Sequence, residues 1–198
     1  MKDVWKVYFN GGFGGKSPDG SHPGQALKLN QKFRFAGRDW YVPAAYLTAK
    51  GLVLDILMRA DKAALEDFCK KWEHLEDEDV PNDVFEQAER ENPLAFEFSP
   101  QIELNGQTLP FSQGHGLSYH PVFQNAAACE AVLDEDGESD FDTSIERAIL
   151  DHYGLNPEDG WAIHRYSFPW KTKRRPKSIS LLALTLTPQP VRAPGAEF

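Results

Sequence analysis

Runs of apolar residues and of alternating apolar and polar residues in the first 60 positions predict strands joined by glycine-rich turns. Val4 to Phe9 is apolar and aromatic, and Phe33 to Val42 predicts a hairpin because aromatic and charged residues alternate around a short turn. Pro43 predicts that the second strand of this hairpin ends there or lies at a sheet edge. Residues 10–24 hold six glycines and two prolines, which predicts a long loop.

The run Gly51 to Met58 has a different pattern, because it is apolar at both alternate sets of positions apart from Asp55. Such a run is typical of a strand that is covered on both faces. Further along, residues 102–109 predict a second hairpin, since Asn105-Gly106 suits a two-residue turn. Extended segments at 161–168 and 179–186 complete the expected strands.

Apolar residues at helical spacing predict two pairs of helices between the strands. The first pair covers 62–75, with Asp61 as its N-cap, and 81–91. The second pair covers 122–133 and a helix that begins at a capping box of Thr143 and Glu146. The expected fold is therefore α+β, an antiparallel β-sheet or sandwich with two inserted helical pairs. A single domain over residues 1–198 is expected, with truncation or a further segment beyond 193 left open.

Composition limits the class of partner. The formal net charge of −9 disfavours general nucleic-acid binding, which needs a basic surface. No apolar run is long enough to cross a bilayer, so no membrane partner is expected. The N-terminus lacks the pattern of a secretory signal, and the two cysteines, Cys69 and Cys129, fall on apolar faces of predicted helices. A cytoplasmic location is therefore expected.

Two parts of the chain are similar to other sequences. Residues 37–43 together with 50–55, and Trp161 to Trp170, resemble uncharacterised bacterial proteins that have no assigned activity. The resemblance implies no catalytic residue and no substrate.

Two motifs imitate ligand-binding loops but lack the structural context of those loops. Residues 10–17 end in Gly-Lys-Ser, like a phosphate-binding loop, but the prolines and glycines that follow prevent a helix from starting there. Residues 134–140 have the composition of a calcium loop without its spacing. We interpret the first as a surface loop and the second as an acidic connection.

The segment Gly114 to Pro121 holds the residues best suited to catalysis. His115, Tyr119 and His120 lie here in a predicted loop, and histidine carries protons or binds metals near neutral pH. The spacing matches no zinc pattern, and a further ligand would have to come from His152 or His164. We therefore keep His115, Tyr119 and His120 as catalytic candidates and predict no metal and no other cofactor.

Residues 170–177 hold five basic residues beside an aromatic one. Trp170, Arg174 and Arg175 are the candidates for a binding surface, because arginine makes bidentate contacts with anionic groups. The expected partner is an unknown protein or an anionic ligand. The favoured function is thus a non-enzymatic intracellular binding module that uses this basic hairpin loop. The alternative is a small hydrolase or metal-dependent enzyme centred on the His115/His120 loop, with residues 10–24 as its cover.

Overall fold

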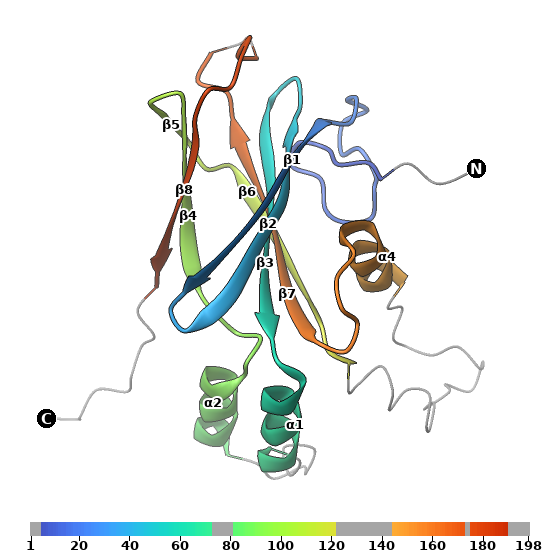
Figure 1. Ribbon diagram of the computed structural model, residues 1–198, viewed down its shortest axis with the longest axis vertical. Helices are drawn as coiled ribbons and strands as arrows, with labels where there is room; N and C mark the ends of the chain where they lie inside the picture. Colours follow the sequence, from blue (N-terminus) through green and yellow to red (C-terminus); the bar gives the residue numbers. More distant parts are fainter. Residues whose placement is uncertain (1–4, 73–80, 122–143, 173–174, 190–198) are drawn as a thin grey trace, which may run out of the picture.

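The computed structural model describes residues 5–72, 81–121, 144–172 and 175–189. Within these residues, two antiparallel sheets face each other, and helices lie at one end and on one outer face (Figure 1). The strands are β1 Gln25–Phe35, β2 Arg38–Leu47, β3 Gly51–Ala60, β4 Phe98–Leu104, β5 Gln107–Leu109, β6 Gln113–Tyr119, β7 Gly160–Pro169 and β8 Leu182–Pro188. The helices are α1 Lys62–Lys71, α2 Asn82–Glu91 and α4 Ser144–Tyr153.

The two sheets differ in size. The larger has the order β1-β2-β3-β7-β6, and the smaller has the order β5-β4-β8. Every strand pair in both sheets is antiparallel. The antiparallel α+β class predicted from the sequence is therefore confirmed.

The strand β3 is covered on both faces, as its continuous apolar pattern predicts. Leu52, Leu54, Ile56 and Met58 point to the inner face of the five-stranded sheet, where they pack with Ile102 and other residues of the smaller sheet. The alternate residues Val53 and Leu57 lie on the outer face, under the N-terminal segment and α4 respectively. Successive side chains of a strand point to opposite faces, so one strand serves two cores.

Both predicted hairpins form with left-handed backbone at their turns. Asn105 and Gly106 have φ of 50° and 79°, and Ala36 and Gly37 have φ of 51° and 75°. Positive φ at both central residues matches the twist of the flanking strands, which is why Asn-Gly favours such turns.

Pro43 neither ends its strand nor lies at a sheet edge. β2 continues to Leu47 between β1 and β3, so the prediction of an edge strand is wrong. The pairing of β2 with β3 shifts register between Tyr41 and Ala45. Proline lacks an N–H, and a bulge is the place where a central strand tolerates it.

The two helices predicted between β3 and β4 are present. α1 begins after Asp61, but the Asp61 carboxylate makes no capping bond and lies 2.8 Å from a nitrogen of Arg59. α4 ends at Tyr153, Gly154 follows with φ of 63°, and the Leu155 N–H donates to the Leu150 carbonyl at 2.9 Å. No helix in the described part of the chain is long and apolar enough to cross a membrane. The predicted partner of α4 at 122–133, Thr143 of the capping box and the acidic connection 134–140 lie outside the described residues.

Two further segments differ from the expectation. Residues 5–9 of the predicted first strand lie outside the strands, although Val7 and Phe9 are buried. The predicted loop at 114–121 is instead mostly the edge strand β6, paired with β7. Within this strand, a Cβ at Gly114 would lie 2.7 Å from Cε1 of Tyr166. Glycine is therefore needed for close packing and not for a turn.

Gly51 gives a test of this packing. A Cβ at Gly51 would lie 2.3 Å from the backbone oxygen of Phe168, so Gly51→Ala must displace β7 and should lower the free energy of unfolding by about 2–3 kcal/mol. Urea denaturation followed by circular dichroism measures the change. Gly14→Ala is the matched control, because nothing lies within 4 Å of a Cβ there. Equal stability of both variants would contradict the close approach of β3 and β7.

Candidate functional site

The outer face of the five-stranded sheet contains a buried ion pair. Asp55 on β3 lies opposite Arg165 on β7 in the strand register, and both side chains are 0% exposed. Arg165 donates from Nε to Oδ1 of Asp55 at 2.8 Å and from Nη2 to Oδ2 at 2.7 Å. This bidentate geometry is the strongest form of the interaction.

Further groups complete the hydrogen bonding of this pair. The Tyr153 hydroxyl of α4 donates to Oδ2 of Asp55 at 2.5 Å and lies 2.7 Å from the Tyr46 hydroxyl of β2. Arg165 Nη1 donates to the carbonyl of Gly12 at 2.8 Å, and its guanidinium lies 4.5 Å from the centre of the Phe13 ring. The cluster therefore fixes the glycine-rich N-terminal segment and α4 to the sheet.

The electrostatics of this cluster favour a structural role. Burial and the charge of Asp55 raise the pKa of Tyr46 to about 12 and raise the pKa of Tyr153 above its ordinary value. Burial opposes the charge on Arg165, but the attraction of Asp55 outweighs it and raises the pKa of the guanidinium. Neither tyrosine can act as a base near neutral pH, and the ion pair is closed to solvent.

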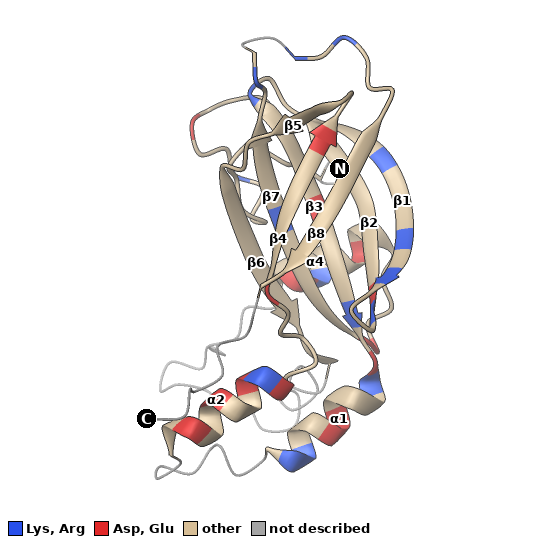
Figure 2. Ribbon diagram, turned by 90° about the vertical axis from the view of Figure 1, so that its left-hand side faces the viewer, with Lys and Arg blue, Asp and Glu red and all other residues tan. Residues whose placement is uncertain are grey.

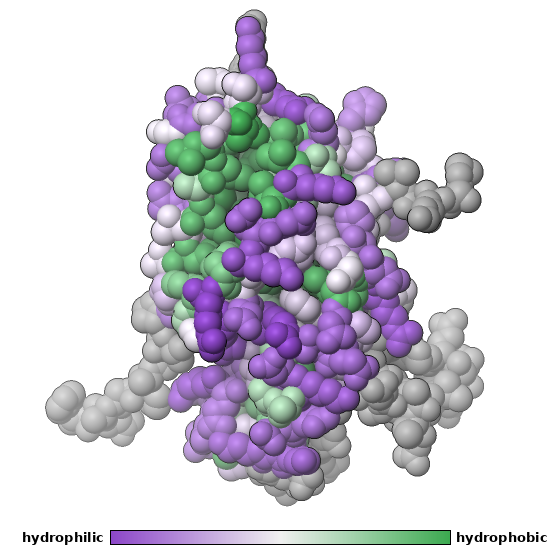
Figure 3. All heavy atoms as spheres, in the orientation of Figure 1, coloured by the Kyte–Doolittle hydropathy of each residue, from purple (hydrophilic) through white to green (hydrophobic). Residues whose placement is uncertain are grey.

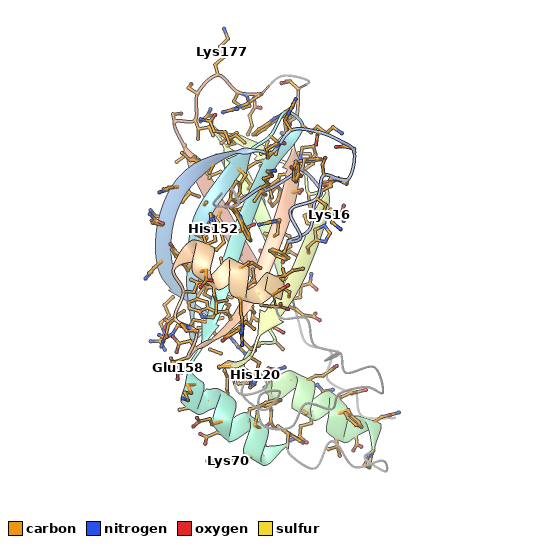
Figure 4. All side chains as sticks on the ribbon, turned by 90° about the vertical axis from the view of Figure 1, so that its right-hand side faces the viewer. Lys16, Lys70, His120, His152, Glu158 and Lys177 are labelled. Carbon is orange, nitrogen blue, oxygen red and sulfur yellow. The ribbon has the colours of Figure 1, made fainter. Side chains whose placement is uncertain are left out.

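The catalytic candidates have three separate surroundings. His115 lies on β6 with Nε2 3.0 Å from Nε2 of Gln113, whereas the Tyr119 hydroxyl donates to the Pro157 carbonyl at 3.0 Å. Nε2 of His120 lies 3.7 Å from Sγ of Cys69, beside α1 (Figure 4). The structure does not bring these three residues together.

The two further histidines do not join the catalytic candidates. His152 of α4 stacks on Trp5 with ring centroids 4.6 Å apart, on the outer face of the sheet. His164 of β7 lies on the inner face, with its ring centroid 5.0 Å from that of Phe98. In the described part of the chain, no group of three or more His, Cys, Asp or Glu residues is placed to hold a metal.

The candidate binding residues of the basic loop also have different surroundings. Trp170 is 8% exposed, packs in the core between the sheets and donates from Nε1 to the Thr48 carbonyl at 3.1 Å, so its ring offers little surface to a partner. Arg175 is exposed and donates from Nη2 to Oε1 of Gln25 at 2.9 Å. Arg174 lies outside the described residues. The loop lies at the end of the sheets opposite α1 and α2, as the position of Lys177 shows (Figure 4).

An apolar cleft between β1 and β8 is the feature that sequence reasoning missed. Its volume is about 480 Å³. It is lined by Leu29, Gln31, Phe33, Arg34, Phe35, Val42, Leu54, Leu182, Leu184, Thr185 and Leu186. Hydrophobic surface is gathered on this side of the molecule, and hydrophilic side chains border it (Figure 3). The cleft lies between strands that are more than 140 positions apart in sequence, so no local pattern could reveal it.

Arg34 lines this cleft, and two further basic residues of β1, Lys28 and Lys32, lie on the same strand outside the lining. Lys28, Lys32 and Arg34 form bands of positive charge along β1 (Figure 2). None of the three is within ion-pair distance of a carboxylate among the described residues, whereas Arg59 on β3 lies 2.8 Å from a carboxylate oxygen of Asp159. Nζ of Lys32 lies over the ring of Tyr41, 5.4 Å from the ring centroid. The charge on β1 is thus open to an external anion.

A larger groove of about 760 Å³ lies on the outer face, between β1, β2 and the segment after α4. Three of its four charged residues interact with each other, because Arg59 donates to Asp159 from Nε at 2.8 Å and from Nη2 at 3.1 Å and lies 3.9 Å from Asp39. The fourth, Lys32, lines this groove and is not part of the lining of the cleft between β1 and β8. The cleft between β1 and β8 is therefore the stronger candidate, because its lining is mostly apolar and its charged residue, Arg34, has no carboxylate within ion-pair distance among the described residues.

Comparisons with known proteins found no match among family models, curated proteins or solved structures. The cleft geometry and its charges therefore carry the functional argument.

Loss of one partner of the buried ion pair should be costly. We expect Asp55→Ala to lower the free energy of unfolding by about 3–5 kcal/mol, because Arg165 stays buried without its counterion. The double variant Asp55→Leu with Arg165→Met should lose less, since no charge remains buried. Asp39→Ala, which removes an exposed carboxylate, is the control and should change stability by less than about 1 kcal/mol. Urea denaturation measures all three, and a double variant as unstable as Asp55→Ala would contradict this interpretation.

His164 should make the protein sensitive to acid. Burial lowers its pKa from 6.5 to about 4, so the unfolded chain binds the proton more readily than the folded one. Stability from this group is complete above pH 6.5 and is lost as the pH falls towards 4, by about 3 kcal/mol.

His164→Asn should reduce the loss of stability between pH 7 and pH 4 by roughly that amount. Denaturation curves across this pH range measure it, with the exposed His22→Asn as the control. An unchanged pH dependence in His164→Asn would show that the imidazole is accessible to protons in the folded state.

Proposed function

We propose that the chain is a non-enzymatic binding module that holds an apolar, negatively charged ligand in the cleft between β1 and β8. The observation that carries this proposal is the combination of an apolar lining with a basic strand whose charges have no carboxylate partner among the described residues. The cleft volume of about 480 Å³ falls within the usual range for ligand sites.

The basic loop supports the same proposal from one end of the cleft. Arg175 donates to Gln25, the first residue of β1, so the loop is tied to the strand that carries the basic residues. In the proposed module, Arg174 and Arg175 add long-range attraction for an anion, while Trp170 supports the loop from the core. In this proposal the two arginines attract the ligand, and the tryptophan does not contact it.

The second candidate function is a small enzyme centred on His120. The observation in its favour is that Sγ of Cys69 lies 3.7 Å from Nε2 of His120, a nucleophile beside a base. Burial raises the pKa of the Cys69 thiol and lowers the pKa of His120, so both groups favour their neutral forms. An activated cysteine needs the opposite directions, with a thiolate beside an imidazolium. This function therefore ranks second.

Binding of the fluorescent probe 8-anilinonaphthalene-1-sulfonate, which is both apolar and anionic, tests the cleft. We expect Leu184→Asp to weaken the affinity at least about tenfold, because it places a negative charge in the lining. Arg34→Glu, at an exposed position of the lining, should act in the same direction and is less demanding for folding. Fluorescence titration of the folded variants measures both.

Phe85→Asp is the matched control, since it removes an apolar residue that is 42% exposed on α2 and adds the same charge. Its affinity for the probe should equal that of the wild-type chain. Failure of the wild-type chain to bind, or an equal loss in Phe85→Asp, would overturn the cleft as the binding site.

A further inference from the structure

Each of the two strands that border the cleft has one free edge, and this edge faces the cleft. β1 ends the five-stranded sheet and β8 ends the three-stranded sheet, and within the described residues neither has a strand neighbour on the cleft side. A free strand edge presents a row of backbone N–H and C=O groups that can pair with another chain. The cleft therefore offers backbone hydrogen bonding from both sides as well as apolar contact.

The directions of these strands suit one particular addition. β1 and β8 run in the same direction (Figure 1), and all strand pairs in the described sheets are antiparallel. A single segment running the opposite way between them would pair antiparallel with both. It would also join the two sheets along this side of the sandwich.

The side chains on the two borders define what such a segment must carry. Leu29 and Phe33 of β1 and Leu184 and Leu186 of β8 pack towards the core, so alternate residues of the segment would be apolar. The residues between them would lie on the outer side, next to Lys28 and Lys32 of β1 and to the uncharged Thr185 and Thr187 of β8. Cross-strand pairs of opposite charge are favourable, so acidic residues fit these positions.

From these features we infer that the ligand of the proposed cleft is an extended segment of a separate polypeptide, in which apolar and acidic residues alternate. It adds as an antiparallel strand between β1 and β8. This inference rests on the proposed binding function and names its ligand. A second copy of this chain that used its own β1 would bring Lys28, Lys32 and Arg34 against the same basic residues, which disfavours it. An alkyl carboxylate would leave both strand edges unpaired.

The experiment uses the full chain and fluorescein-labelled peptides of about nine residues, which is within the usual range of strand lengths. One peptide alternates valine with glutamate, a second alternates valine with lysine, and a third is the glutamate peptide with every valine N-methylated. We expect the glutamate peptide to bind at least about tenfold more tightly than either of the others, because only it offers both charge and backbone donors. Fluorescence anisotropy measures the three affinities.

A charge exchange tests the register of the contact. The variant Lys32→Glu with Arg34→Glu should prefer the lysine peptide over the glutamate peptide, a reversal of about tenfold or more. Lys16→Glu with Lys70→Glu changes the net charge equally, away from the cleft, and should keep the wild-type preference. Hydrogen exchange should slow in residues 25–35 and 182–188 when the glutamate peptide binds, and remain unchanged in 113–119.

The outcomes separate this inference from the proposed function. Binding of 8-anilinonaphthalene-1-sulfonate to the cleft without a preference for the unmethylated glutamate peptide would overturn strand addition and leave the binding module standing. Displacement of the probe by dodecanoate but not by the peptide would also overturn strand addition and leave the binding module standing. A cleft that is closed by dimerisation of the chain alone would have the same consequence. Failure of every probe to bind would overturn both proposals.

Discussion

The buried ion pair of Asp55 and Arg165 is the interaction on which most of the outer face of the sheet depends. Two charges with 0% exposure would be strongly unfavourable without compensation, so each needs its neighbours in place. Tyr153 brings α4 to the pair, and the Gly12 carbonyl brings the N-terminal segment. Asn10 supports the same attachment through its N–H to Ser167 Oγ at 3.0 Å. The outer face is thus fixed in one arrangement by polar geometry, and its apolar residues fill the space that this geometry leaves.

The inner face of the larger sheet is stabilised differently from the outer face, because it is covered only by apolar packing between sheets of unequal size. In the described part of the chain, five strands face three, and the smaller sheet covers the middle of the larger one through Ile102, Leu104 and Phe98. Towards β1 this cover ends at β8. Leu29, Phe33 and Phe35 are consequently only partly buried, although they belong to the same core. The cleft results from this difference in strand number and needs no special loop to form it.

The sequence predicts most of the elements whose cause is local. The apolar pattern of 51–58, the Asn105-Gly106 turn and the start of α1 after Asp61 all depend on neighbouring residues and were predicted correctly. β6 was missed because residues 114–121 were interpreted as a loop, whereas Gly114 allows close packing against the Tyr166 ring of the neighbouring strand β7. Asp55 stood out as the exception in an apolar run, but its partner is 110 positions away. A single acidic residue in a buried strand is the sequence signal that could have indicated this ion pair. The cleft could not be predicted either, because the two strands that border it are far apart in the sequence.

The shared direction of β1 and β8 also limits how the molecule can close on itself. Neighbouring strands in an antiparallel sheet run in opposite directions, so only an odd number of strands inserted between β1 and β8 would give antiparallel pairs throughout. Direct contact between β1 and β8 would create a parallel pair, in conflict with every other pair described. The shared direction of β1 and β8 thus disfavours direct pairing of the two strands across the opening.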